Sequence, residues 1–168
     1  KDILYDDSNS KVRGIVTGEK GVKKDGEKSN LYEPPIALIG KQTIFAEGCR
    51  GHLGKKLINK FNLYDSNQFQ TYALGLKELW EVKNDALKKG DVLHSIGWPL
   101  NNNAYGGSFI YKLSETLLSV GFVIGLDYKN TYLNPYEEFQ RFKTHKKIKF
   151  ILNDGKRISY GARALNEG

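Results

Sequence analysis

Four apolar runs in the second half of the chain limit its possible folds more than any other part of the sequence. They follow one another at short spacing: QTYALGLKELWEV (70–82), DVLHSIGWPL (91–100), GGSFIYKL (106–113) and SVGFVIGLDY (119–128). Runs of this length, rich in β-branched and aromatic residues and separated by turn residues, are typical of strands. Their close succession predicts a meander of antiparallel sheet.

A helix is expected directly after these four runs. Asn134 can cap it, Pro135 suits the first helical position, and two glutamates follow in the first turn. Three aromatic residues recur at every third position and are expected to bury one face of this helix: Tyr136, Phe139 and Phe142. The segment RISYGARALNEG (157–168) predicts a final strand and the start of a glycine-rich turn.

The first half has a different character. Residues 3–17 predict a β-hairpin, residues 18–30 a polar surface loop, and TIFAEG (43–48) a short buried strand. An amphipathic helix is expected next, because apolar residues recur at helical spacing: Leu53, Leu57, Ile58 and Phe61. The composition shifts near residues 62–67, so we expect an α/β segment over 1–67 and a mostly β domain over 68–168. The expected fold class is α+β.

Composition excludes several classes of protein. No apolar run approaches the roughly 18 residues that a membrane-spanning helix needs. The single Cys49 rules out an internal disulfide framework and a cysteine-ligated metal site made by this chain alone, and the three histidines show no ligand spacing. The net charge is +7, densest at RFKTHKKIK (141–149). Because no nucleic-acid-reading motif accompanies this run, a solvated basic face is favoured over a nucleic-acid site.

The chain contains no methionine, and it opens inside a strand-like run. We therefore expect it to be an internal piece of a longer protein.

Two adjacent glycines stand before the third apolar run. Gly106 and Gly107 weaken a strand unless something requires bare backbone there. One interpretation is a β-bulge that turns the sheet, which these residues alone favour. The other is that a flat ring, such as a quinone, lies against the backbone. The walls of such a pocket would come from its apolar neighbours: Tyr105, Phe109, Trp98 and Leu100.

A second glycine-rich position is AEGCRG (46–51), between the expected strand and helix. The N–H groups at the start of a helix suit a phosphate. The segment lacks the G-x-G-x-x-G pattern, however, so it is not a primary dinucleotide fingerprint, and a plain strand-to-helix turn is the simpler reading. Ser108 and Ser119 have no histidine near them in the sequence, so hydrolase chemistry has no support.

Six blocks together resemble the electron transfer flavoprotein–ubiquinone oxidoreductase family. In chain order they are TIFAEGCRGHL, QTYALGLKELWEV, GWPLNNNAYGGSFIY, GFVIGLDYKN, YLNPYEEFQRFK and RISYGARALNEG. They cover most of the chain, and the longer blocks are highly specific. The least characteristic parts are residues 19–30 and the linker NDALKKGD.

The resemblance implies that the parent enzyme carries FAD and a [4Fe-4S] cluster. It implies that this enzyme passes electrons from reduced electron transfer flavoprotein to ubiquinone in the respiratory chain, as part of fatty acid oxidation. It implies a monotopic protein on the matrix side of the mitochondrial inner membrane, or on the bacterial cytoplasmic membrane, with no nucleic-acid partner. It also implies that the protein supplies placement and polarity rather than acid–base catalysis, so no catalytic residue and no metal ligand is expected in this chain.

The same resemblance implies two groups of site residues. The quinone head group is expected at Gly106 and Gly107, with Tyr105 beside them. Expected neighbours of FAD are Glu47, Gly48 and Gly51.

The chain departs from the family's pattern in three respects. The G-x-G-x-x-G strand is missing, and the lone Cys49 cannot supply four cluster ligands. Lys112 stands where relatives commonly have histidine. We therefore expect the isolated chain to be inactive. Two alternatives remain at the level of sequence: an FAD-dependent hydroxylase or reductase of related fold without quinone, and a non-catalytic basic binding module.

Overall fold

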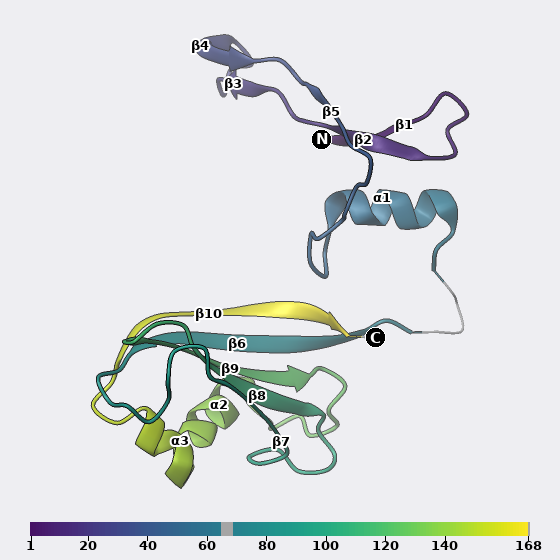
Figure 1. Ribbon diagram of the computed structural model, residues 1–168. Helices are drawn as coiled ribbons and strands as arrows, with labels where there is room; N and C mark the ends of the chain where they lie inside the picture. Colours follow the sequence, from purple (N-terminus) through teal and green to yellow (C-terminus); the bar gives the residue numbers. More distant parts are fainter. Residues whose placement is uncertain (65–68, 168) are drawn as a thin grey trace. The chain divides into compact units, whose positions relative to one another are not determined.

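The computed structural model describes residues 1–64 and 69–167, which divide into two compact units, Lys1–Phe69 and Gln70–Gly168. The first unit contains two small antiparallel sheets and one helix (Figure 1). Its elements are β1 (Asp2–Tyr5), β2 (Val12–Val16), β3 (Lys20–Val22), β4 (Lys28–Glu33), β5 (Ala37–Ile39) and α1 (His52–Phe61). The predicted hairpin is confirmed by the pairing of β1 with β2, and the predicted amphipathic helix is α1.

Two predictions for the first unit are wrong. The segment 18–30 is not only a loop: β3 and β4 form a hairpin around Asp25 and Gly26, where Gly26 has a φ of 89°. An Asp-Gly turn closes this hairpin although few of its side chains are buried. Residues 43–48 form no strand, and Ile44 is 87% exposed. The sheet β1-β2-β5 contains no segment beyond Ile39, so this apolar run has no partner strand.

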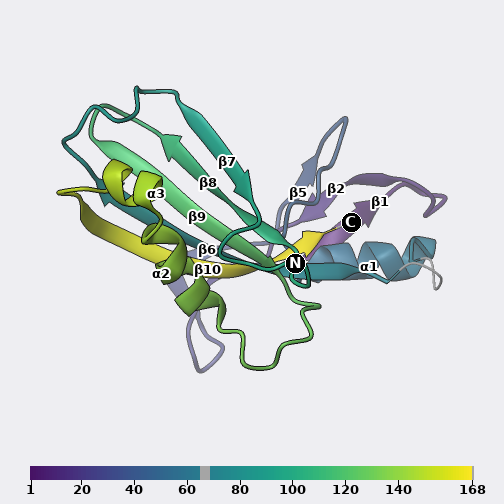
Figure 2. The same cartoon turned by 90° about the horizontal axis from the view of Figure 1, so that it is seen from below.

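The second unit is a five-stranded antiparallel sheet with two helices on one face (Figures 1 and 2). Its strands are β6 (Thr71–Glu81), β7 (Val92–Ile96), β8 (Gly106–Lys112), β9 (Leu117–Gly125) and β10 (Lys156–Glu167), and its helices are α2 (Pro135–Lys143) and α3 (Lys146–Ile151). The strand order is β10-β6-β9-β8-β7. All four predicted strands and the final strand are present, so the fold class is α+β as expected.

The meander prediction is correct for only part of the sheet. β7, β8 and β9 are consecutive neighbours, but β6 pairs with β9 and not with β7. On its other side, β6 pairs with β10 over almost its whole length. The five strands therefore enclose β6 in the interior of the sheet, a placement that local spacing does not encode.

α2 begins as the sequence predicts. The Asn134 side-chain oxygen accepts hydrogen bonds from the amides of Tyr136 (3.0 Å) and Glu137 (3.4 Å), which satisfies two of the otherwise unpaired amides of the first turn. Phe139 and Phe142 are buried, but Tyr136 is 51% exposed, which corrects the predicted three-residue apolar face. An α-helix repeats every 3.6 residues, so a strict three-residue series drifts off the buried side.

The core of the second unit lies between the sheet and its helices. The Phe122 ring is 6.0 Å from Phe139 and 5.6 Å from Phe142, measured between centroids. The remaining core residues are Leu76, Val82, Leu100, Ile110, Leu118, Val120, Ile124, Ile151 and Leu152. We call the sheet surface turned toward α2 and α3 the helix face, and the opposite surface the open face.

Candidate functional site

The glycine pair occupies the first two positions of β8, in an interior strand. Gly106 pairs with Ile124 of β9, and Gly107 pairs with Val123 of β9 and with Ile96 of β7. Neither ladder shifts register at these positions, so the β-bulge that the residues alone favoured is not present.

Close approach of neighbouring strands explains why both positions are glycine. A Cβ atom at Gly106 would lie 2.3 Å from the carbonyl oxygen of Val123, and one at Gly107 would lie 2.4 Å from the carbonyl oxygen of Ser95. Both contacts are with backbone, which cannot move aside cheaply. The pair therefore has a structural reason that is independent of any ligand.

The two glycines face opposite sides of the sheet, because successive residues of a strand alternate. Gly107 belongs to the open face with Ile96, which is 89% exposed. Gly106 belongs to the helix face, where the Leu100 side chain would lie 2.6 Å from its Cβ. Tyr105 precedes them with 70% exposure, and its carbonyl accepts a hydrogen bond of 2.8 Å from the amide of Gly125.

The four predicted wall residues do not line one pocket. Leu100 is buried in the core on the helix face. Trp98 packs its ring 5.3 Å from His145, and Arg141 lies 5.8 Å from the same ring. Phe109 lies on the open face, where its ring covers Gly121 so closely that a Cβ there would be 2.0 Å from it. A ring bound at the glycine pair would therefore meet different walls on the two faces.

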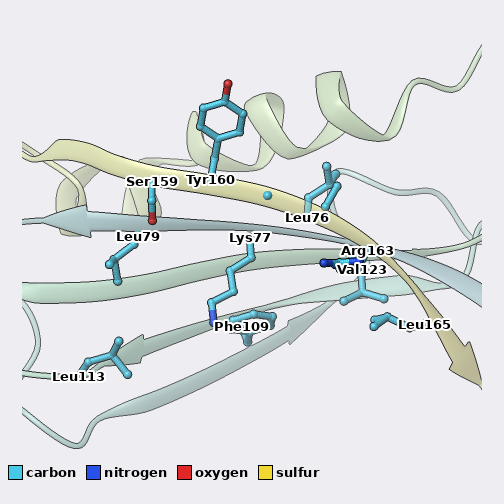
Figure 3. A pocket seen from close by; sticks show the side chains of 13 residues that line it. Leu76, Lys77, Leu79, Phe109, Leu113, Val123, Ser159, Tyr160, Arg163 and Leu165 are labelled. Carbon is cyan, nitrogen blue, oxygen red and sulfur yellow. The ribbon is translucent and has the colours of Figure 1, made fainter. Parts of the chain in front are cut away.

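A shallow groove of about 590 Å³ runs along the open face. Figure 3 shows Lys77 and Leu79 of β6, Phe109 of β8, and Val123 of β9 on the same side of the sheet, whereas Tyr160 of β10 points to the other side. The floor is mainly apolar and includes the bare backbone of Gly75. This combination suits a flat apolar ligand or an apolar protein surface.

A smaller groove of about 440 Å³ lies where β7 meets α2 and α3. Inside it the hydroxyl oxygens of Ser95 and Ser108 are 2.6 Å apart. Their bond joins β7 to β8 next to the glycine pair, so Ser108 has a structural role.

The open face also carries a polar pair that the sequence interpretation missed. The Tyr111 hydroxyl of β8 and His94 Nε2 of β7 are 3.1 Å apart, and their rings are 5.6 Å apart. The Tyr111 ring in turn stacks on Phe109 at 4.7 Å. The sequence shows both residues, but only the register of the β7–β8 hairpin brings them together: His94 stands opposite Phe109, two residues from Tyr111.

A second missed feature is a buried ionic cluster on the helix face. Glu78 is 2% exposed and accepts hydrogen bonds from Lys143 (2.8 and 2.9 Å), Trp80 (2.7 Å) and Arg157 (3.0 Å). Burial is the largest single influence and raises the pKa of Glu78, but the hydrogen bonds, that from Lys143 foremost, together outweigh it and lower the pKa. The cluster ties α2 and β10 to β6.

The predicted FAD neighbours gather at the start of α1 in the first unit. Glu47 accepts hydrogen bonds from the amides of Gly54 (2.6 Å) and Leu53 (3.1 Å), which lower its pKa. A Cβ at Gly51 would lie 2.8 Å from the Glu47 side chain, whereas Gly48 has a φ of 77° and open space around it. A carboxylate of the chain itself thus occupies the place that a phosphate would take, so these residues do not form a phosphate site.

Within residues 1–64 and 69–167, no cluster of histidine, cysteine or acidic side chains could hold a metal ion. In the same residues no helix is long and apolar enough to cross a membrane.

Comparison with known proteins gives a consistent result. A family model described as "ETF-QO, ubiquinone-binding" matches residues 72–165. The chain is 53% identical to the mitochondrial electron transfer flavoprotein-ubiquinone oxidoreductase of Sus scrofa, 52% to that of Mus musculus and 47% to that of Oryza sativa subsp. japonica, in each case over 99% of its length. It spans 27%, 27% and 29% of those proteins, respectively.

Among solved structures, the flavin-dependent brominase Bmp2 superposes on the chain with a TM-score of 0.52 at 14% identity, covering 99% of this chain and 37% of that one. At this level of identity the match shows similarity of fold only.

Proposed function

Because the chain belongs to the electron transfer flavoprotein–ubiquinone oxidoreductase family, we propose that the protein carrying it reduces ubiquinone with electrons taken from reduced electron transfer flavoprotein. The observation that carries the proposal is the match of the ubiquinone-binding family model to residues 72–165, nearly the whole second unit. The role assigned to this chain is to form the quinone site, and the electrons arrive through parts of the protein that it does not contain.

The proposed quinone site lies at Gly106, Gly107 and Tyr105. On the open face, a ring resting on Gly107 would lie beside Ile96 and the Phe109 ring, both apolar, so the head group would be partly shielded from water. Backbone groups at the very start of β8, where β7 has already ended at Ile96, are the proposed partners of the quinone oxygens, since no charged side chain occupies these positions. The mainly apolar groove along this face then suits the isoprenoid tail.

FAD and a [4Fe-4S] cluster belong to the proposed parent protein. The chain's residues do not fit the phosphates of FAD, because Glu47 already accepts the first amides of α1. Glu47, Gly48 and Gly51 are proposed only as neighbours of the flavin, with the open backbone of Gly48 as the closest point. The single Cys49 cannot hold a cluster. No step of electron transfer is therefore assigned to residues of this chain.

The location is proposed from the relatives, whose names place them in mitochondria. We propose the matrix side of the inner membrane, where ubiquinone is available from the lipid, with the protein lying on the membrane surface.

The first experiment uses the whole protein purified from its source. Its mass and visible spectrum are recorded, and its reduction of a short-tail ubiquinone by reduced electron transfer flavoprotein is assayed. We expect a polypeptide several times longer than this chain, with flavin bands over a broad iron–sulfur absorbance that bleach on reduction. A colourless protein of about 19.0 kDa without quinone reduction would refute the proposal.

A substitution then tests the position of the ring. Replacing either glycine would disturb β7 or β9 directly. A loss of activity in such a variant would therefore not distinguish a damaged quinone site from a damaged fold. Ile96→Glu is better, because Ile96 is 89% exposed beside Gly107. We expect it to weaken quinone reduction at least tenfold and to leave flavin reduction by the electron donor unchanged. Phe150→Glu, on an exposed position of α3, is the matched control. Equal quinone kinetics in both variants would place the ring elsewhere.

A further inference from the structure

The pair formed by His94 and Tyr111 joins β7 to β8, as the Ser95–Ser108 pair does, but it is exposed to solvent whereas the serine pair is partly buried. The His94–Tyr111 pair lies on the open face at the edge strand β7, and His94 is exposed to solvent. The Tyr111 hydroxyl holds Nε2 of the imidazole at 3.1 Å, which leaves Nδ1 as the second ring nitrogen. The stacking of Tyr111 on Phe109 fixes the direction from which the hydroxyl approaches.

Strand register places this pair next to the proposed ring position. Gly107 stands opposite Ile96, and His94 opposite Phe109, all on the open face. Two residues along a strand span about 6.8 Å, so Phe109 is the next open-face residue after Gly107 on β8, and His94 lies across from it on β7. A ring that rests on Gly107 and points diagonally toward β7 therefore brings one oxygen toward His94.

We propose that His94 is the residue that delivers a proton to ubiquinone, and that Tyr111 positions its imidazole. The inference rests on the proposed function, since it requires a quinone at Gly107. It differs from the expectation drawn from the family resemblance, in which the protein supplies no acid–base group.

The quinone takes up two electrons, which come from the electron transfer flavoprotein named in the family, and two protons. At the oxygen nearest His94, the Nδ1–H bond of the imidazolium breaks and an O–H bond forms. The neutral imidazole then takes a replacement proton from water, which its exposure allows. The second oxygen, near the backbone of β8, receives its proton from solvent.

The charged and titratable groups near His94 are few. Tyr111 faces it from β8. His145 and Lys147, at the start of α3, border the groove between β7 and the helices that His94 also lines. Both residues lie on the side of the helices, away from the proposed quinone position on the open face. Substituting them therefore tests whether a change of charge near β7 is enough to alter the rate.

The test uses the whole protein, reduced beforehand and mixed with a short-tail ubiquinone in a stopped-flow instrument, so that only the quinone half-reaction is observed. In the unmodified protein we expect the rate to fall as the pH rises, because deprotonation of the donor removes the proton that is transferred. His94→Gln should slow the reaction about 100-fold, the lower end for a general acid, and should abolish this pH dependence. Tyr111→Phe should slow it less and keep the pH dependence.

Two controls separate position from fold. His145→Gln should leave the rate and its pH profile unchanged. Binding of the quinone, measured by quenching of protein fluorescence, should remain within about twofold in His94→Gln, because the loss concerns proton delivery and not affinity. As a readout independent of turnover, adding the short-tail ubiquinone should shift the His94 imidazole resonance in the NMR spectrum.

The outcomes are distinct. If the unmodified protein reduces no quinone, the proposed function fails. If Ile96→Glu impairs quinone reduction but His94→Gln keeps the normal rate and pH profile, the quinone site stands and the role of His94 is wrong. An unshifted His94 resonance at saturating quinone would also overturn it.

Discussion

Replacing Glu78 by glutamine should destabilise the second unit strongly. Glu78 is 2% exposed, and the Lys143 side chain that it neutralises is only 11% exposed. Removing one partner of a buried ion pair costs about 3–5 kcal/mol, because the other charge stays buried without compensation. Arg157 is 38% exposed and can turn to solvent, so only Lys143 is stranded. The lower end, about 3 kcal/mol, is therefore the expected loss.

Two measurements on the whole protein test this value. At about 4 °C per kcal/mol for a domain of this size, the melting temperature of the second unit should fall by about 12 °C. Hydrogen exchange of peptides from α2 should accelerate roughly 100-fold, since each 1.4 kcal/mol is a factor of ten. Glu115→Gln, at an exposed glutamate of the same unit, should change neither quantity.

A double substitution tests the stated cause. Glu78→Gln combined with Lys143→Met removes both buried charges and should recover most of the lost stability, because an uncharged buried pair carries no desolvation penalty of this kind. If Glu78→Gln alone leaves α2 exchange and melting unchanged, Glu78 does not anchor the helix. If the double variant is less stable than the single one, the buried charge of Lys143 is not the source of the loss.

Three further predictions concern the same unit. Folding lowers the pKa of Glu78, so ionised Glu78 stabilises the folded state fully above its pKa in the unfolded chain, about 4.3. This stabilisation is lost as the pH falls through the pKa of Glu78 in the folded state. Melting temperatures measured in acid should show this loss, and Glu78→Gln should lack it. Asn134→Ala removes the cap of α2 and should lower stability by about 1 kcal/mol, whereas Asn134→Ser should keep most of it in urea unfolding. Gly121→Ala places a methyl group against the Phe109 ring and should cost about 1–3 kcal/mol, with a visible change in the near-ultraviolet circular dichroism; an unchanged spectrum and stability would contradict the packing described for the open face.

The sequence predicted the strands of the second unit well because each carries its own apolar pattern, and it predicted α2 because Asn134 and Pro135 are local signals. It did not predict that β6 lies beside β9, since that choice depends on which partner covers an interior strand. Residues 43–48 show the opposite error: an apolar run is not a strand when no neighbouring strand offers its hydrogen bonds.

The candidate sites were harder to predict from the sequence than the fold. Glu78 and its charged partners Lys143 and Arg157 lie 65 and 79 positions apart in the sequence, so no spacing rule connects them. The glycine pair was noticed, but the bulge that the residues alone favoured is absent, because neighbouring backbones approach both glycines closely; the quinone site that the resemblance implied there stays a prediction. His94 and Tyr111 become a pair only once the β7–β8 register is known.

The pairing of β6 with β10 has a consequence during synthesis. Thr71, at the start of β6, bonds through its hydroxyl to the carbonyl of Glu167 at 2.6 Å, across 96 positions of sequence. At about 5–20 residues per second, a ribosome needs roughly 5–20 s to make that interval. Throughout this time β6 presents at least one unpaired edge, and unpaired edges recruit other strands. A nascent chain stalled before Lys156 would therefore be a ready substrate for chaperones that bind extended segments.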